Sequence, residues 1–265
     1  MITENQQLAR KPDLKTFRAE LHLHTVLSPC AQVEMIPPLI VRHALEHEIN
    51  LIAVTDHNAT ANIAAVQKAA QRSGLSVLPG MELQTREEVH VLCLFDTLEQ
   101  AYALQAIVDR LLPNIENRAE FFGEQFVVDE TGDFIRIEPR LLSTSVNLSL
   151  SEAWREVERL GGLFIPAHVN RRGFGLIANL GIVPTNIPLA ALEISRHLHP
   201  DHAAATIPQI KGYPLIQSGD VHGLDGFLGT TIFKLAEPTI QEIKLALSGK
   251  QDRSFTIAAS TNKIS

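Results

Sequence analysis

Short apolar runs alternate along the chain with segments whose apolar residues recur at helical spacing. Runs such as "INLIAV", "GLFIPA" and "YPLIQS" are almost continuously apolar, which is typical of strands covered on both faces. Strands are predicted at 17–24, 50–55, 75–79, 88–95, 162–167, 190–195 and 214–218. Helices are predicted between them at 38–48, 60–73, 97–112, 151–160 and 238–248. This alternation predicts βα units, a parallel sheet and an α/β fold that forms a barrel or a strongly curled sheet.

The alternation is interrupted between residues 113 and 150. There, "GEQFVVDETGDFIRIEP" predicts a β-hairpin, with two β-rich arms around an acidic turn that contains glycine. We expect this segment to be an insertion, a lid or an interface element in a single domain that spans 1–265. Residues 253–265 are expected to form a weakly specified tail.

Composition limits the classes of partner. The formal net charge of −7 argues against a broad electrostatic grip on nucleic acid or on an anionic membrane. The only cysteines, Cys30 and Cys93, make no disulfide framework, which favours a reducing compartment. The chain shows no secretory signal and no apolar segment long enough to span a membrane. We therefore expect a cytoplasmic protein without a membrane partner.

The eleven histidines are about twice the usual share for a chain of 265 residues. On a strand at 17–24, Glu20, His22 and His24 would point to one face, opposite Ala19 and Leu21. The two imidazoles could share one metal ion. An isolated pair of this kind is more often incidental.

Further residues of the ligand type follow other predicted strands. They are Asp56, His57, Glu82, His90, His168, Asp220 and His222. Because parallel strands bring their carboxyl ends to one rim, we expect these side chains to converge there. Six imidazoles, two carboxylates and the possible thiolate of Cys30 exceed the needs of one tetrahedral zinc. They suit about two or three ions bridged by a carboxylate, an arrangement that serves phosphoester hydrolysis.

The motifs "HLHT", "TDHN", "PGMEL", "AHV" and "GDVHG", in this order, resemble those of the PHP (polymerase and histidinol phosphatase) superfamily. The resemblance implies a distorted seven-stranded (β/α)7 TIM-like barrel with two to three zinc, manganese or iron ions that hydrolyses phosphate esters. It implies three ligand sets: His22, His24, Glu82 and Asp220; Glu82, His90 and His168; and His57, His222 and Cys30. Position 30 is commonly His or Asp in the family, and a cysteine there favours zinc or ferrous iron. If Cys30 turns away, only two ions would bind.

The predicted mechanism is attack of a metal-bound hydroxide on phosphorus. Arg171, Arg172 and Arg196 are candidates to anchor the phosphate, because the planar guanidinium matches its oxygens. Asp56, His57 or His222 is expected to relay the proton to the leaving group, although Asp56 could instead orient an imidazole. Glu193 is expected to be either a group that supports a ligand or a buried paired acid.

The expected substrate is a small phosphomonoester or a nucleotide phosphate. The acidic balance and the lack of a basic, aromatic stripe disfavour long nucleic acid, and the oligomeric state is left open. Two rival functions remain. One is a non-catalytic PHP module acting on a partner, against which the intact ligand set argues. The other is a metal-dependent amidohydrolase, which often uses a carbamylated lysine where this chain has Glu82.

Overall fold

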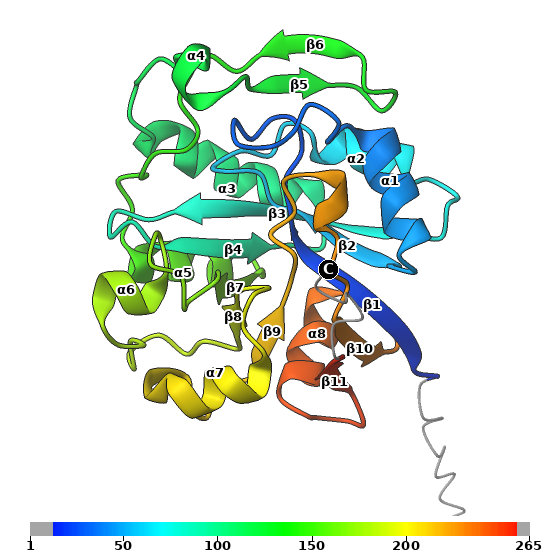
Figure 1. Cartoon of the computed structure of the whole chain (residues 1–265), viewed down its shortest axis with the longest axis vertical. Coiled ribbons are helices and arrows are strands. Elements are labelled where there is room, and N and C mark those ends of the chain that lie inside the picture. Colours follow the sequence, from blue (N-terminus) through cyan, green and yellow to red (C-terminus); the bar gives the residue numbers. More distant parts are fainter. Residues whose placement is uncertain (1–12, 259–265) are drawn as a thin grey trace, which may run out of the picture.

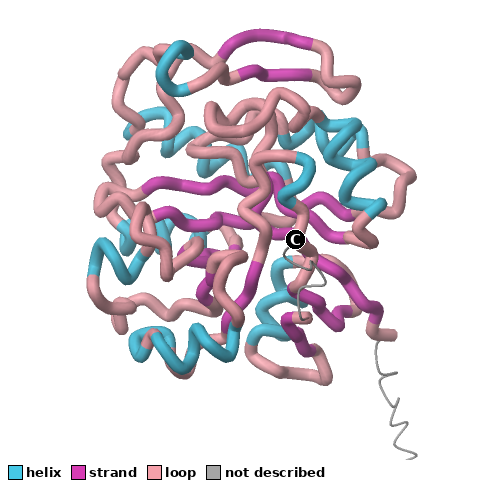
Figure 2. Tube along the Cα trace, viewed as in Figure 1, coloured by secondary structure: helices cyan, strands magenta, loops and turns pink. Residues whose placement is uncertain are grey.

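The structure is a computed structural model that describes residues 13–258 of the chain. Its centre is a curled seven-stranded sheet, around which most helices lie on the outside (Figures 1 and 2). The strand order is β11-β10-β1-β2-β3-β4-β7. The bounds are β1 Lys15–Leu23, β2 Leu51–Val54, β3 Ser76–Gln84, β4 His90–Leu94, β7 Leu163–Pro166, β10 Thr231–Leu235 and β11 Ser254–Ile257.

The sheet is mixed, whereas the sequence predicted a parallel one. β1, β2 and β3 are parallel, but β4 runs antiparallel to both β3 and β7, and β10 runs antiparallel to β1. The reason is the short connection "TREEV" between β3 and β4, in which the main-chain amide of Thr85 donates a hydrogen bond to the main-chain oxygen of Val89. A parallel crossover needs about a dozen residues or more, so this connection can only form a hairpin.

Two of the seven predicted strands lie outside this sheet. β8 (Leu192–Ile194) and β9 (Leu215–Gln217) form a separate parallel pair. Main-chain hydrogen bonds link the pair to its neighbours: Val169, beyond β7, donates to Glu193, and Val221, beyond β9, donates to His22 and accepts from His24. The α/β class is therefore confirmed. The distorted seven-stranded (β/α)7 barrel is not confirmed, because the strands that were expected to form it are divided between a curled sheet and a separate two-stranded pair.

The end of the chain differs from the prediction as well. Ser254–Ile257, part of the expected tail, is strand β11, which pairs with β10 and packs Phe255 against Phe233 at 5.9 Å between ring centroids. The remainder of that predicted tail, 259–265, lies outside the described residues.

All five predicted helices are present: α1 Pro37–Glu46, α2 Ile63–Ala69, α3 Leu98–Leu111, α5 Leu150–Arg159 and α8 Ile240–Leu247. Capping boxes at Thr97 and Ser149 begin α3 and α5, because each hydroxyl accepts from the main chain three residues on. The shorter helices are α4 Ala119–Phe122, α6 Leu176–Leu180 and α7 Pro200–Thr206, with 3-10 turns η1 Pro208–Ile210 and η2 Leu224–Gly226. Among the described residues, no helix combines the length and apolarity needed to cross a membrane.

The core has two parts. A large cluster lies between the sheet and helices α1, α2, α3 and α5, and a smaller one is closed by Ile240 and Ile243 of α8. Leu21 belongs to the smaller cluster and Leu23 to the larger, because the pairing of β1 with β2 shifts register between Glu20 and Leu23. This irregularity breaks the simple alternation that was expected along β1.

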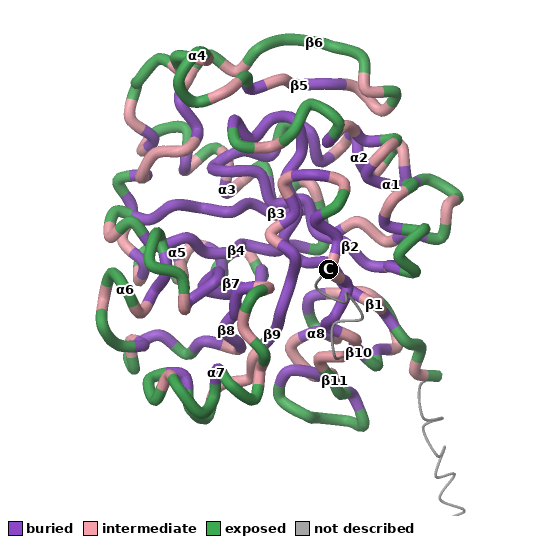
Figure 3. Tube along the Cα trace, viewed as in Figure 1, coloured by how far each residue is buried: buried purple, intermediate pink, exposed green. Residues whose placement is uncertain are grey.

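The segment 113–150 contains an antiparallel hairpin of β5 (Phe126–Val128) and β6 (Phe134–Ile137), at the top of Figure 1. Every residue of β6 is exposed (Figure 3). Asn62 holds β5 to the body of the protein: its amide group donates to Phe126 O at 3.0 Å, and its side-chain oxygen accepts from Val128 N at 3.0 Å. Whether the hairpin is an insertion stays a prediction.

We predict that Asn62→Ala loosens this hairpin, since it leaves a carbonyl and an amide of β5 without partners. The expected loss of unfolding free energy is about 1–3 kcal/mol, measured by chemical denaturation. Amide hydrogen exchange at Val128 should accelerate at the same time. Asn179→Ala, which removes hydrogen bonds to Glu87 and Glu88, is the control and should leave Val128 protected. Equal exchange at Val128 in both variants would contradict the anchoring role.

Candidate metal centre

Glu82 of β3 lies at the centre of a cluster of imidazoles. Its side chain is only 1% exposed, and both carboxylate oxygens face ring nitrogens. Oε1 lies 3.2 Å from His22 Nε2, 2.8 Å from His90 Nδ1 and 3.1 Å from His168 Nε2, and Oε2 lies 3.2 Å from His24 Nε2 and 3.0 Å from His57 Nδ1. The structure therefore brings together, around one carboxylate, five histidines that the sequence singled out.

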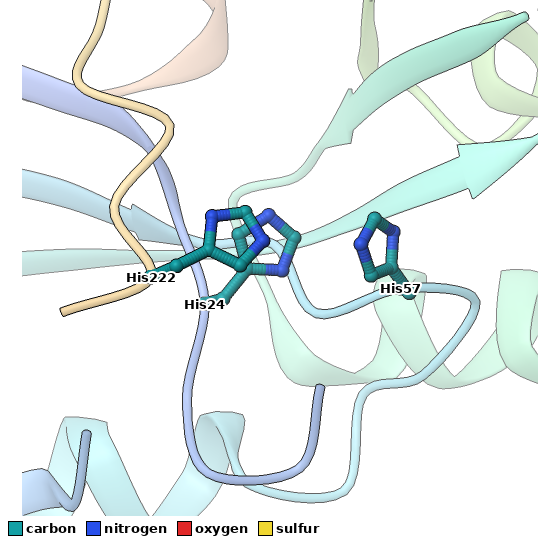
Figure 4. A group of neighbouring side chains, drawn as sticks. All are labelled: His24, His57 and His222. Carbon is teal, nitrogen blue, oxygen red and sulfur yellow. The ribbon is translucent and has the colours of Figure 1, made fainter. Parts of the chain in front are cut away.

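The potential ligand atoms form three overlapping groups, within each of which all atoms lie within 4.8 Å of one another. The groups are His22, His24, Glu82 and Asp220; His57, Glu82 and His90; and His24, His57 and His222. Figure 4 shows the last group, in which the rings of His24 and His222 stack at 4.0 Å between centroids. Because the groups share members, they form one continuous site.

The direction of β4 explains how His90 reaches this site. His90 is the first residue of β4, not the last. Since β4 runs opposite to β3 and β7, its amino end lies at the same rim as their carboxyl ends. His168 and Asp220 follow β7 and β9 with backbone φ values of +29° and +51°. Such conformations are uncommon outside glycine and occur at functional sites that hold them in place.

Hydrogen bonds at Nδ1 fix the ring tautomer of three histidines. His22 Nδ1 lies 2.9 Å from Glu193 Oε2, and His222 Nδ1 lies 2.9 Å from the carbonyl oxygen of Asp220. Both oxygens only accept, so each Nδ1 carries the proton and leaves Nε2 free with a lone pair. The bond to Glu193 decides between the two roles that the sequence left open, because this carboxylate orients a ligand-type histidine.

A chain of hydrogen bonds through Ser28 fixes the ring tautomer of His24 in the same way. The Ser28 hydroxyl donates to Asp56 Oδ1 at 2.7 Å, so toward His24 Nδ1, at 2.9 Å, it can only accept. Asp56 also accepts from the amide and the hydroxyl of Thr25. Asp56 is thus buried and linked to His24 through Ser28, an arrangement that suits a residue that orients the ring. Its oxygens are engaged in this network and Asp56 does not line the pocket. Its expected role as a proton relay stays a prediction.

The donor set fits divalent ions. Buried atoms without a hydrogen-bond partner include His22 Nε2, His24 Nε2, His57 Nδ1, His90 Nδ1, Glu82 Oε2 and Asp220 Oδ1. Buried polar atoms are nearly always paired, and these six unpaired atoms all belong to the cluster around Glu82. Imidazole nitrogens and carboxylate oxygens in such numbers are ligands for zinc, manganese or iron.

The side chains of the cluster shift one another's pKa values. Burial raises the pKa of Glu82, but the charges of His90, His22 and His57 outweigh it and hold that pKa well below the usual range. Burial lowers the pKa of His57, whereas Glu82 and Cys30 raise it to about 10 overall. Burial lowers the pKa of His90 to about 4. Metal binding here would compete with protons, because ligands must be deprotonated.

Cys30 lies beside the group of His24, His57 and His222. Burial raises the pKa of its thiol, but hydrogen bonds with His222 and His57 lower it to about 5 overall. Cys30 is also on the lining of the pocket in front of the cluster. Its role as a ligand stays a prediction.

The three candidate arginines occupy different places. Arg171 Nη1 forms an ion pair of 2.6 Å with Asp220 Oδ2 and lines the pockets on both sides of this pair. Arg196 donates to the carbonyl oxygens of Gly219 and Gly226 and lines only the second pocket. Arg172 is exposed and lines neither pocket.

Glu20 supports the site in a way that the sequence analysis missed. It is fully buried, and its carboxylate accepts from the amides of Gly219, Leu228 and Gly229 at 2.7, 2.9 and 3.2 Å. These bonds hold the loop that carries Asp220 and His222. Ser28 and Gln84, whose side-chain oxygen lies 3.4 Å from His90 Nε2, were missed too. The available signal was that Glu20, Ser28 and Gln84 are polar residues within four positions of a candidate ligand.

The curled α/β fold carries at its rim a cluster of imidazoles and carboxylates that could hold metal ions. Residues 20–131 match the family model of the PHP domain, which confirms the resemblance, and this family comprises metal-dependent hydrolases. Over 80 residues the chain is 35% identical to the 5'-3' exoribonuclease Rnm of Escherichia coli, in an alignment that covers 28% of this chain and 26% of that protein. The chain thus spans about a quarter of that relative.

Two solved proteins share the fold. The lesion-specific endonuclease Q of Pyrococcus furiosus is 19% identical, with a TM-score of 0.68 over 91% of this chain and 58% of that one. Endonuclease Q has also been solved with a 27-mer duplex that carries an abasic lesion. A putative metal-dependent phosphoesterase of Bifidobacterium adolescentis is 18% identical, with a TM-score of 0.52 over 77% of this chain and 87% of that one.

These relatives show that the expectation of a small substrate, with long nucleic acid disfavoured, is wrong. It was drawn from the net charge of −7 and from the lack of a basic, aromatic stripe, yet part of the chain matches an exoribonuclease in sequence, and an endonuclease solved with a 27-mer duplex shares its fold. The physical reason is that the formal charge counts no bound ions, which are often the largest local charges in a site.

We predict that Ser28→Ala weakens metal binding about 10- to 100-fold, because it frees the His24 ring from its fixed tautomer. The measurement is titration of chelator-treated protein with zinc or manganese against an indicator. Ser151→Ala on α5, which lies away from the cluster, is the control and should bind as the original chain does. An unchanged affinity in Ser28→Ala would contradict the role of this chain of hydrogen bonds.

We further predict that Cys30 in chelator-treated protein reacts with iodoacetamide at a nearly constant rate from about pH 6 to 9. Its pKa of about 5 keeps the thiolate present over this range, whereas a thiol with a pKa of about 8.5 would lose roughly tenfold per pH unit below that value. Mass spectrometry measures the modification. Cys93 is the internal control, because burial raises its pKa and shields it. A rate that climbs steadily to pH 8 would rule out the hydrogen bonds from His222 and His57.

Proposed function

We propose that this chain is a metal-dependent phosphoester hydrolase that cleaves phosphodiester bonds in nucleic acid. The observation that supports this most is the buried carboxylate of Glu82, which faces five imidazoles at the base of an open pocket. A site in which one carboxylate can bridge ions suits in-line displacement at phosphorus. The exoribonuclease relative supports a nucleic-acid substrate, as does the shared fold of endonuclease Q.

The proposed ligands are the three sets that the PHP resemblance implies, which overlap the three groups and add His168 and Cys30. His22, His24, Glu82 and Asp220 would hold one ion; Glu82, His90 and His168, with His57 beside them, a second; and His57, His222 and Cys30, with His24 beside them, a third. When bound, such ions lower the pKa of coordinated water toward neutrality and stabilise charge on phosphoryl oxygens. Zinc, manganese and iron all suit these donors.

Arg171 is the proposed phosphate anchor. Its guanidinium is tied to Asp220 by one nitrogen, which leaves further donors for a phosphate that lies across the pocket. Arg196 lines the neighbouring pocket, where it could contact the next phosphate of a strand. Arg172 is too far toward solvent to be proposed for the reacting phosphate.

His222 is proposed as a ligand, so the lone pair on its Nε2 is engaged and another group must protonate the leaving oxygen. The side chain of His222 is 28% exposed at the pocket, whereas that of His57 is 8% exposed and Asp56 is fully buried. The bond from His222 Nδ1 to the carbonyl of Asp220 fixes the ring and directs Nε2 away from that carbonyl. A non-catalytic role would not require this complete and supported ligand set.

The first experiment measures metal content by elemental mass spectrometry on protein purified without chelator. It is paired with hydrolysis of single-stranded and duplex RNA and DNA and of an aryl phosphate. We expect about two to three ions per chain and cleavage of at least one nucleic acid. Chelation should abolish cleavage, and zinc, manganese or ferrous iron should restore it.

His168→Ala should lower kcat by about a hundredfold or more, since loss of a ligand removes several kcal/mol of transition-state stabilisation. His202→Ala, on the exposed surface of α7, is the matched control and should retain full activity. A full metal complement with no cleavage of any phosphoester would refute the proposed function. Absence of metal binding would favour the non-catalytic alternative.

A further inference from the structure

Phe174 lies at the mouth of the pocket in front of the metal-ligand cluster. It lines this pocket, of about 330 Å³, together with Arg171, Gln84 and Ser143. One face of its ring stacks on His90, with 4.5 Å between centroids and 6° between planes. The residue is nevertheless 40% exposed. An aromatic ring thus borders the proposed reaction site with part of its surface open.

The backbone holds Phe174 in this place despite a conformation that bulky residues seldom adopt. Its φ is +58°, and its carbonyl oxygen accepts from the amide of His90 at 3.0 Å. Gly175 allows the turn, because a Cβ there would lie 2.2 Å from the carbonyl oxygen of Arg171. The segment "NRRGFG" therefore presents an arginine and a phenylalanine to the same pocket.

We propose that Phe174 is a specificity-determining residue on which the base next to the scissile phosphate stacks. This inference rests on the proposed function, which it deepens by naming the substrate group that the pocket selects. Aromatic side chains are general platforms for bases, because every base offers a π-face. Arg171, three residues earlier, would hold the phosphate while Phe174 holds the base attached to it. Gln84 and Ser143 supply polar groups for the edge of that base.

The observed exposure favours this role over a purely structural one. A ring that only shields His90 would be more stable if its neighbours covered its apolar surface. Phe174 instead leaves two fifths of its surface open at a polar pocket. A nucleobase fits such a place, because it combines an apolar face with a polar edge.

The test compares Phe174→Leu, which keeps apolar cover over His90, with Phe174→Tyr, which keeps an aromatic face. Tyr102→Leu on α3, where Tyr102 is 45% exposed outside the pocket, is the control. The substrates are a dinucleotide and its analogues in which either nucleoside is replaced by an abasic residue. A second readout is quenching of 2-aminopurine fluorescence when an uncleavable phosphonate-linked dinucleotide binds.

Phe174→Leu should raise KM for the dinucleotide about 5- to 150-fold, the range expected when a stacked base loses its aromatic partner. It should leave KM for one abasic analogue unchanged and abolish quenching, whereas Phe174→Tyr and Tyr102→Leu retain both. Equal losses on the dinucleotide and on both abasic analogues, or full quenching in Phe174→Leu, would overturn the inference. If the original chain cleaves no phosphoester at all, the proposed function fails, and the quenching measurement still decides the role of Phe174.

Discussion

The burial of the Glu82 carboxylate is the constraint on which the rest of the structure depends. A carboxylate removed from water is strongly unfavourable unless positive charge surrounds it. In this chain the compensation comes from imidazoles on several separate elements, which must therefore meet at one point. β1 supplies His22 and, just beyond its end, His24; the loop after β2 supplies His57, and β4 supplies His90. The curl of the sheet is what brings these positions together.

A second layer of buried groups keeps these imidazoles in one orientation. Glu193 holds His22, and the chain of Asp56 and Ser28 holds His24. Glu20 holds the loop that carries Asp220 and His222 by accepting from three main-chain amides. Burial raises the pKa of this carboxyl to about 7. Such groups would be costly in a core that served only for stability. Their presence indicates that the interior is arranged around the ligand atoms.

Much of this could be predicted from the sequence because strands and ligands carry local signals. Apolar runs marked all seven expected strands, and His-x-His together with the other motifs marked the cluster. The direction of β4 could also have been deduced, since five residues cannot connect parallel strands. The separation of β8 and β9 from the main sheet could not. It depends on how β10 and β11 pair at the other side of β1, which is a contact between segments far apart in the chain.

The site residues, too, divide into those with a local sequence signal and those whose role depends on contacts between distant segments. Ligands such as His90 and Asp220 occur in recognisable motifs, but Ser28 and Glu20 are ordinary residues whose roles exist only through tertiary contacts. The net charge led to the wrong prediction that long nucleic acid is disfavoured, because it does not describe the local arrangement of charges. An overall value of −7 describes the far field of the protein, which screening by salt weakens beyond roughly 10 Å. A phosphate in the pocket would meet Arg171 and the atoms of the cluster at contact distance, where local charge outweighs the net charge.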